Sequence, residues 1–397
     1  MKTIYKNYKF QIKPNKEQEV LLNKHFGSVR FVYNHFLNQR KLQYQENKKA
    51  DNYNKQSSKL TLLKKEEDFN WLSEINSQSL QSALRNLDTA YLNFFRGKLR
   101  FPKFKSKRNR NQSFTVPQHT SIENGKVYFP KFKDGISVIQ HRDLEGKIGK
   151  FTLSKTPTNK YFVSIQMEVE LPEFKVGKKA IGIDLGIKNI AITSDGKLYK
   201  NHIFTKRYET KLKDAQQHLS RKKSGSNSFE KQRRKVALIH EKISNCRKDN
   251  LHKITKEIVS NYDLIVVEDL QVTKMMKSKL LSKLIADVSW FEFVRQLTYK
   301  SGWNGKQLVK VDRYYPSSKT CSNCGFINQS LKLSDRIWTC NECQSKLDRD
   351  LNASINILKE GINKIGVELA DYTSGEDVIL SNQLFSAKLE AMSFRAC

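Results

Sequence analysis

The first hundred residues combine one strand pattern with a longer helical pattern. Residues 3–12 alternate loosely between polar and apolar side chains, as in a β-strand with one buried face. Apolar residues then recur every three or four positions as far as Val32, and the same spacing returns between residues 80 and 94. We therefore expect a strand followed by a helical unit over residues 14–96, interrupted by a polar loop near residues 45–58.

Different patterns fill the rest of the chain. Between residues 113 and 170, short apolar runs are separated by turn-forming residues, which is typical of a β-rich segment. Residues 172–177 form a junction, and beyond it two apolar runs, residues 180–184 and 264–268, each end in a carboxylate. Long helical patterns occupy residues 201–260 between these runs. The sequence thus predicts a multidomain α+β protein with interior strands in its second half.

The net charge narrows the class of partner. The 397 residues include 72 Lys and Arg against 40 Asp and Glu, a formal charge of +32. This surplus indicates a polyanionic partner and argues against an enzyme for a small neutral metabolite. A hydrophobic content of 38% supports folded cores. Because no apolar run approaches the roughly 20 residues that cross a bilayer, we expect a cytoplasmic, nucleoid-associated prokaryotic protein that binds nucleic acid and no membrane.

Two segments carry a large excess of positive charge. Residues 96–110 contain eight basic residues, two interleaved phenylalanines and no acid, and residues 201–260 contain 16 basic residues against six acidic ones. Basic side chains beside aromatic rings suit backbone phosphates and stacked bases, although a solvated helical face is the alternative for the second segment. The predicted nucleic-acid contacts are Arg96, Lys98, Arg100, Lys103, Lys105, Lys107, Arg108, Arg221, Lys222, Lys223, Arg233, Arg234 and Arg247.

Four of the six cysteines form two Cys-x-x-Cys pairs. Cys321 and Cys324 are followed, after a loop of 15 residues, by Cys340 and Cys343. Two such pairs present four thiolates tetrahedrally to a zinc ion, with Zn–S distances of about 2.3 Å. A site closed by four protein ligands has no open position for water, so we expect the zinc to be structural. The alternative is two unrelated pairs of free thiols.

Three acidic residues stand in contexts that favour a metal-dependent active site. Because the last third of the chain contains no histidine, hard divalent cations there would need carboxylate ligands. Asp184 and Glu268 end the two apolar runs, and Asp350 lies in the first turn of a helical pattern with one apolar face. Singly, each has a plainer interpretation as a turn residue. We interpret the neighbouring acids Asp269 and Asp348 as a turn residue and an N-cap.

Several blocks of sequence occur in a recognisable order. They are residues 183–189 (Ile-Asp-Leu-Gly-Ile-Lys-Asn), 267–270 (Val-Glu-Asp-Leu), 317–325 (Ser-Ser-Lys-Thr-Cys-Ser-Asn-Cys-Gly), 340–343 (Cys-Asn-Glu-Cys) and 348–353 (Asp-Arg-Asp-Leu-Asn-Ala). Together they resemble the TnpB family of transposon-encoded, RNA-guided DNA endonucleases, which is related to type V CRISPR effectors. Further similarity at residues 8–18, 30–34 and 101–105 extends the likeness over roughly residues 5–358. Ser354 and Gln344 depart from the usual Ala and Gly.

The resemblance implies a RuvC-like, RNase H-type nuclease whose catalytic acids are Asp184, Glu268 and Asp350. Two Mg²⁺ ions, about 3.5–4 Å apart and bridged by Asp184, would then hydrolyse a phosphodiester. A guide RNA from the transposon end would select double-stranded target DNA beside a short flanking motif. One zinc ion would be structural.

The resemblance also implies a domain order. The expected parts are a β-barrel wedge domain (residues 1–13 and 106–174), an inserted helical recognition domain (14–105), the nuclease domain (175–315 and 348–365), a zinc ribbon (316–347) and a C-terminal tail (366–397) without a family counterpart.

Other functions stay open at this point. Gly182-Ile-Asp-Leu-Gly186 also occurs in the phosphate loop of actin-like ATPases, although the cysteine pairs and the charge argue against that class. An RNase H-type transposase would use the same acids to join DNA strands, and a nuclease-inactive, RNA-guided repressor would bind without cutting. The aromatic side chains of Trp290 and Phe291 are expected to pack in a core rather than stack on bases.

Overall fold

The computed structural model describes residues 3–109, 111–171, 179–278, 281–332 and 334–365. The chain divides into two compact units, Met1–Glu170 and Leu171–Cys397. The expected junction at residues 172–177, Arg110 of the basic segment and the C-terminal tail at residues 366–397 lie outside the described residues. Within the part of the chain that is described, no helix has the length and apolar character required to span a bilayer.

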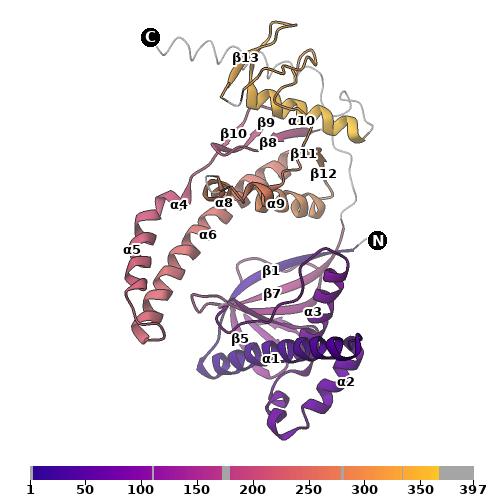
Figure 1. Cartoon of the computed structure of the whole chain (residues 1–397), viewed down its shortest axis with the longest axis vertical. Coiled ribbons are helices and arrows are strands. Elements are labelled where there is room, and N and C mark those ends of the chain that lie inside the picture. Colours follow the sequence, from indigo (N-terminus) through magenta and orange to yellow (C-terminus); the bar gives the residue numbers. More distant parts are fainter. Residues whose placement is uncertain (1–2, 110, 172–178, 279–280, 333, 366–397) are drawn as a thin grey trace. The chain divides into compact units, whose positions relative to one another are not determined.

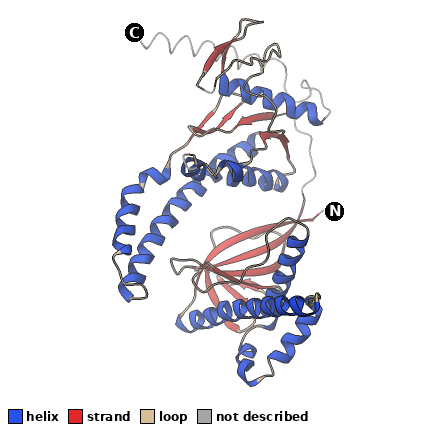
Figure 2. Cartoon of the chain, in the orientation of Figure 1, coloured by secondary structure: helices blue, strands red, loops and turns tan. Residues whose placement is uncertain are grey.

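Unit 1 combines a sheet with three α-helices (Figures 1 and 2). Its elements are β1 (Thr3–Lys13), α1 (Lys16–Asn47), α2 (Tyr53–Leu63), a 3₁₀ segment (Glu67–Glu74), α3 (Ser77–Phe95), β2 (Gln112–Val116), β3 (Ser121–Glu123), β4 (Lys126–Phe129), β5 (Phe132–Ile139), β6 (Lys147–Lys155) and β7 (Tyr161–Glu170).

The sheet of unit 1 is antiparallel, with the strand order β2-β6-β7-β1-β5-β4-β3. β1 lies inside it, pairing Phe10 with Val163 of β7 and Gln11 with Ile139 of β5. β2 and β3 are the edge strands, and no pairing joins them among the described residues. Buried side chains of β1, α1 and α3, including Phe10 and Leu84, belong to one hydrophobic cluster. The helices and the sheet of unit 1 therefore share a single core.

The first expected helix is longer than its apolar pattern, and the expected polar loop is shorter. Asn15 caps α1 through a capping box with Gln18, in which each side chain bonds the other residue's backbone N–H. α1 runs to Asn47, and α2 begins soon after because the Asn52 side chain accepts a hydrogen bond from Lys55 N–H. The loop between them is limited to residues 48–52. Local capping, which the hydrophobic pattern does not report, sets these boundaries.

Unit 2 contains a five-stranded sheet, a two-stranded sheet and the helices α4–α10 (Figure 1). Its elements are β8 (Ala180–Asp184), β9 (Asn189–Thr193), β10 (Leu198–Lys200), α4 (Phe204–Arg207), α5 (Glu209–Ser220), α6 (Asn227–Asn261), β11 (Leu264–Glu268), α7 (Val272–Met275), α8 (Ser282–Val288), α9 (Trp290–Trp303), β12 (Gln307–Val311), β13 (Ile337–Thr339), β14 (Lys346–Asp348) and α10 (Arg349–Ile365).

The larger sheet of unit 2 has the order β10-β9-β8-β11-β12, with β8, β11 and β12 parallel. Helices cover both faces (Figure 1). On β8, Ile181 and Ile183 belong to the cluster that contains α6 and α9, while Ala180 joins the cluster formed with α10. Because successive side chains of a strand point to opposite faces, the apolar run of β8 is buried on both sides. This explains its unbroken hydrophobic sequence.

A glycine allows α10 to lie directly on β8. A Cβ atom added at Gly182 would lie 2.1 Å from the carbonyl oxygen of Ser354 and 2.7 Å from the backbone nitrogen of Leu358. Both atoms belong to the backbone of α10, so any larger residue would push the helix away from the strand. Close backbone approach thus sets the position of α10 over the end of β8.

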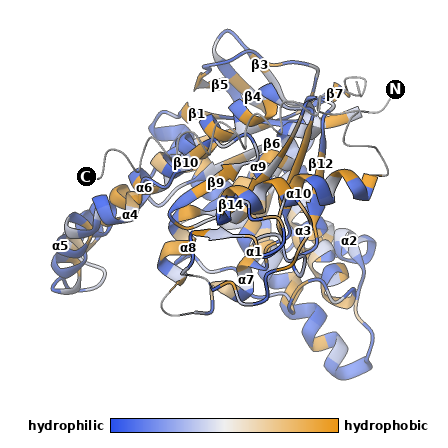
Figure 3. Ribbon diagram, turned by 90° about the horizontal axis from the view of Figure 1, so that it is seen from above, coloured by the Kyte–Doolittle hydropathy of each residue, from blue (hydrophilic) through white to orange (hydrophobic). Residues whose placement is uncertain are grey.

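Helices α5 and α6 form a hairpin in unit 2 (Figure 1). Its turn spans residues 221–226, and Ser226 caps α6 by accepting a hydrogen bond from Phe229 N–H. The residues of α5 are mostly hydrophilic (Figure 3). In α9, Trp290 is buried as expected, but Phe291 is 68% exposed, so the prediction of a core position for Phe291 was wrong. Phe291 lies on the solvent side of a helix whose buried face contains Phe293 and Leu297.

Candidate active site and metal centre

Asp184 and Glu268 end two neighbouring parallel strands. The register pairs Ile183 of β8 with Val267 of β11. One residue further along, the two carboxylates leave the same edge of the sheet. Carboxyl ends of parallel strands are a common place for the functional groups of an open α/β sheet. Two acids far apart in the sequence are thus brought together by strand pairing.

Asp350 reaches this edge from the first turn of α10. The Asp348 side chain caps that turn, because its Oδ1 accepts hydrogen bonds from the backbone N–H groups of Asp350, at 3.0 Å, and Leu351, at 2.9 Å. The expected N-cap role of Asp348 is therefore confirmed. Leu351, Ile355 and Leu358 bury the apolar side of the helix. Asp350 is thereby fixed at the helix end, with its side chain 24% exposed.

Burial and neighbouring charges disfavour ionisation of Asp184 and Glu268. Burial, together with the smaller effects of the Glu268 and Asp350 charges, raises the pKa of Asp184 to about 8. The charge of Arg349 opposes this shift. Burial also raises the pKa of Glu268, against a hydrogen bond of 2.7 Å that Ser317 Oγ donates to its Oε1. Two buried carboxylates whose ionisation is disfavoured form an environment that a divalent cation stabilises.

Two arginines neutralise Asp350. Arg336 Nη1 lies 2.9 Å from Asp350 Oδ2, and Arg349 Nη2 lies 3.0 Å from Oδ1. Within the described residues, the four cysteines are the group whose ligand atoms gather within 4.8 Å, and the three carboxylates are more widely spaced. The carboxylate oxygens are hard ligands of the type that Mg²⁺ prefers, and the donor chemistry of the site fits such an ion.

The four predicted cysteines meet in space. Their sulfur atoms lie within 4.8 Å of one another, with Cys321 and Cys343 at 3.6 Å and Cys324 and Cys340 at 3.5 Å. Four sulfurs at 2.3 Å from a central zinc would be separated by about 3.8 Å, so the observed spacing fits a tetrahedral site. The cluster can hold a zinc ion.

The two cysteine pairs have matching backbone geometry. Gly325 and Gln344 each follow the second cysteine of a pair, have φ of +80° and +54°, and donate a backbone hydrogen bond to the first cysteine's carbonyl. This left-handed conformation suits glycine and strains other residues. Gln344, which departs from the family pattern, therefore occupies a strained position beside Cys343.

Buried amides join the cysteine segment to α10. Asn352 accepts a hydrogen bond from Ser322 N–H at 2.8 Å and donates one to Thr320 O at 2.7 Å, and Asn356 donates to Ser317 O at 2.8 Å. Both asparagines are at most 2% exposed. Together with the bond from Ser317 to Glu268, they link the metal centre to the acids.

The sequence-based reasoning missed these linking residues. An available signal was the presence of Asn352 and Asn356 on the apolar face of a helical pattern, where a buried amide must find a partner. Arg336, the partner of Asp350, gave no such signal, because an arginine in a loop is ordinarily a surface residue.

The predicted nucleic-acid residues fall into two groups. Those between residues 96 and 108 are exposed, as are the three basic residues at positions 221–223 in the α5–α6 turn and Arg234 in α6. Arg233 instead pairs with Glu230 at 2.7 Å. Arg247 Nε lies 2.7 Å from Oδ1 of Asp287, whose side chain is 1% exposed. That contact gives Arg247 an internal partner, and its predicted contact with nucleic acid stays a prediction.

Three parts of the chain match known families. Residues 162–279 match the family described as "Probable transposase", residues 290–357 match "Cas12f1-like, TNB domain", and residues 1–49 match "Helix-turn-helix domain". The second match includes the four cysteines and Asp350.

Relatives that match this chain along most of its length support the same family. A "Putative RNA-guided DNA endonuclease" of Streptomyces pristinaespiralis is 35% identical over 91% of this chain and 90% of its own length. The "Putative RNA-guided DNA endonuclease InsQ" of Escherichia coli is 33% identical over 89% and 92%. The fold is similar to the protein in a structure of a Cas12f1–sgRNA–target DNA complex, with a TM-score of 0.54 at 14% identity, over 89% of this chain and 98% of that one. The chain belongs to the TnpB family, as its motifs indicated.

Proposed function

We propose that this chain is an RNA-guided DNA endonuclease that cleaves double-stranded DNA complementary to its guide, next to a short flanking motif. The observation that carries the proposal is the position of Asp184 and Glu268 at the carboxyl ends of the paired strands β8 and β11, with Asp350 beside them in the first turn of α10. The family relationship supports the RNA-guided activity. In this proposal base pairing selects the target, and the protein binds the backbone of the heteroduplex.

The carboxylates of Asp184, Glu268 and Asp350 would hold two Mg²⁺ ions. Bound there, the ions would supply Lewis-acid stabilisation and a water activated for attack on the phosphodiester. Strand pairing sets the spacing of Asp184 and Glu268, and α10 holds Asp350. Arg336 and Arg349 form ion pairs with Asp350 and hold its carboxylate in place. Ser317 orients the Glu268 carboxylate through its hydrogen bond.

The finer architecture follows the family pattern as a proposal. Unit 2 would contain the RuvC-like nuclease domain (residues 175–315 and 348–365) and the zinc ribbon (316–347), with one structural zinc held by the four cysteines. Unit 1 would contain the wedge domain (1–13 and 106–174) and the recognition domain (14–105).

The charge distribution predicts strongly salt-dependent binding. The basic residues between positions 96 and 108 and in the α5–α6 turn are exposed and available to phosphates. If about six to ten phosphates are contacted, the affinity for nucleic acid should fall by about 10³- to 10⁵-fold between 50 and 200 mM salt. Filter binding across this range measures the slope, and a flat response would contradict the proposal.

The direct test begins with the RNA that copurifies. The chain is expressed together with the DNA that flanks its gene, and the bound RNA is sequenced. We expect a discrete structured transcript, and the purified complex should cut a plasmid that carries the matching target. Asp184→Ala should retain target binding and lose cleavage. Absence of any bound RNA would remove the proposal.

Two other functions have specific tests. The family description "Probable transposase" favours strand transfer as the second candidate. Sequencing of the reaction products distinguishes the two, because a transposase joins DNA ends and an endonuclease only cuts them. A nuclease-inactive repressor would bind the target with all three acids intact and leave it uncut.

A further inference from the structure

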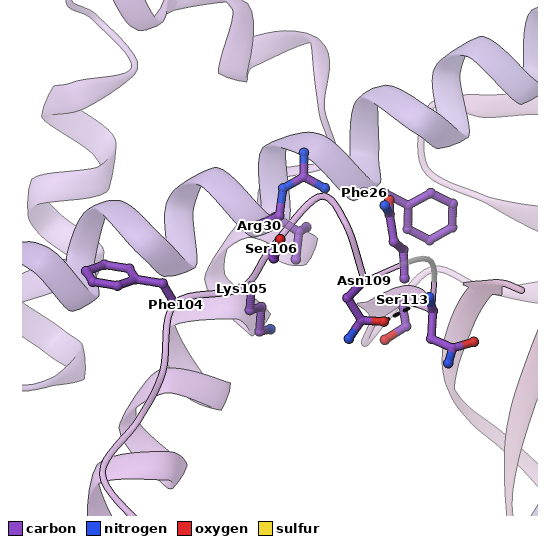
Figure 4. Close-up of a pocket in the computed structure, with 10 residues that line it drawn as sticks. Phe26, Arg30, Phe104, Lys105, Ser106, Asn109 and Ser113 are labelled. Atoms are coloured by element: carbon purple, nitrogen blue, oxygen red, sulfur yellow. Dashed lines mark hydrogen bonds between the residues drawn. The ribbon is translucent and has the colours of Figure 1, made fainter. Parts of the chain in front are cut away.

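Two cavities of unit 1 meet at one arginine. The first, of about 360 Å³, lies between α1 and the chain that follows Phe104, and the second, of about 450 Å³, lies between α1 and the end of β6. Arg30 and Gln112 line both. Figure 4 shows Arg30 extending from the helix, with Ser106 and Asn109 on the adjacent loop.

The lining of these cavities is positively charged. Arg30, Lys105, Lys107 and Lys155 contribute to it, and none of the described residues that line either cavity is Asp or Glu. Arg30 is half-buried, and within the described part of the chain its guanidinium has no hydrogen-bond or ion-pair partner. A guanidinium offers five N–H donors in a planar fork. A half-buried fork without an acceptor indicates that an external anion completes the site.

The walls of the site are fixed before any ligand binds. Asn34 of α1 accepts a hydrogen bond from Lys105 N–H at 2.7 Å and donates one to Lys105 O at 2.8 Å, so the loop is attached to the helix at two points. The Lys105 amine lies 4.1 Å from the centre of the Tyr33 ring. Lys155 Nζ donates to Asn23 at 3.0 Å. Little ordering of the protein is needed on binding, which favours affinity.

A glycine in the middle of α1 keeps the second cavity open. Gly27 lines that cavity, and a Cβ atom added there would meet only Arg30 Nη2, at 4.0 Å. Packing therefore does not require glycine at this position, although glycine costs a helix about 1 kcal/mol relative to alanine. The missing side chain leaves space beside the unpaired guanidinium.

We propose that the two cavities form one binding site for a phosphodiester of a bound nucleic-acid strand, with Arg30 as its central ligand. The Arg30 fork would donate two parallel hydrogen bonds to the phosphate oxygens. Lys105, Lys107 and Lys155 add positive charge, and the amides of Asn109 and Gln112 provide neutral donors. This inference rests on the proposed function and assigns Arg30, Gly27 and Lys155 a part in it.

The test compares Arg30→Gln with Arg142→Gln in the full-length chain. Arg142 is exposed in the same unit and outside both cavities, so the two variants lose the same charge. Binding is measured by filter retention over a salt series, in one arm with the copurified guide RNA and in the other with matched duplex DNA added to the RNA-loaded chain. Because the Arg30 guanidinium has no hydrogen-bond or ion-pair partner among the described residues, its removal should leave Tm unchanged.

We expect Arg30→Gln to weaken binding by about 10- to 100-fold in one arm and to lower the salt slope by about one phosphate contact. The affected arm identifies the strand as guide RNA or target DNA. Arg142→Gln should have a smaller effect in both arms. Gly27→Glu, which puts a carboxylate beside Arg30, should weaken the same arm as Arg30→Gln, and Arg30→Lys should restore part of the affinity.

Two results separate failure of this site from failure of the proposed function. If the wild-type chain binds both nucleic acids and Arg30→Gln matches Arg142→Gln in both arms, the site is overturned and the proposed function stands. If the wild-type chain retains no guide RNA, the proposed function fails, and the site fails with it.

Discussion

Substitution of Gly182 by alanine should uncouple target binding from cleavage. The added Cβ would lie 2.1 Å from the Ser354 carbonyl oxygen, whereas real Cβ atoms stay at least 3.0 Å from such atoms. A gap of 0.9 Å must therefore open between β8 and α10. β8 is held by hydrogen bonds to strands on both sides, so the helix is the element that moves. Asp350 moves with it.

The magnitude follows from that displacement. A misplacement of about 1 Å costs on the order of 100-fold in rate, and overpacking costs about 1–3 kcal/mol of stability. Single-turnover cleavage of a matched target by the RNA-loaded Gly182→Ala chain should therefore fall by about 100-fold, with target affinity retained. Gly302→Ala is the matched control, because its Cβ would meet nothing within 4 Å. Gly302→Ala should cut at the wild-type rate. A Gly182→Ala chain with wild-type cleavage and wild-type Tm would refute this reasoning.

Three further predictions concern stability and metal. Burial lowers the pKa of His25 from 6.5 to about 4, so between these pH values His25 stays neutral in the folded state while the unfolded chain gains a proton. The free energy of unfolding should therefore fall by up to about 3 kcal/mol as the pH is lowered from 6.5 to 4. Urea unfolding of His25→Gln should lack this loss. Gln344→Gly should relieve backbone strain and stabilise the zinc-bound cysteine segment by about 1 kcal/mol. Competition with a chelator measures this change, and zinc retention equal to that of the wild type would contradict the strain. Cys324→Ser should release zinc on dialysis and lower cleavage, because the partners of Asn352 and Asn356 lose their positions; full activity without zinc would contradict this.

Local patterns predicted the parts of the fold that local physics determines. The apolar runs ending in Asp184 and Glu268 are strands because both faces are buried, and the spacing of the cysteines lets two short loops bring four sulfur atoms together. The strand-end contexts of the acids suggested a shared site, and the family likeness supplied the expectation that all three belong to it. Parallel pairing between strands some eighty residues apart leaves no local signal.

Other features depend on long-range contacts that no local pattern encodes. Phe291 lies in an apolar helical segment and is nevertheless exposed, since the buried side of α9 is set by what packs against it. Arg247 belongs to a basic helix, but its partner Asp287 is forty residues away. The shared core of the helices and the sheet in unit 1 likewise follows from tertiary packing.

The central claim is that Asp184, Glu268 and Asp350 serve one divalent-metal site. The most direct measurement is Mg²⁺-dependent cleavage of guide-matched DNA by Asp184→Asn, Glu268→Gln and Asp350→Asn, each loaded with RNA, with target binding measured in parallel. We expect each variant to bind the target as the wild type does and to cut it at least about 1,000-fold more slowly. Wild-type cleavage by any one of the three variants would contradict the claim.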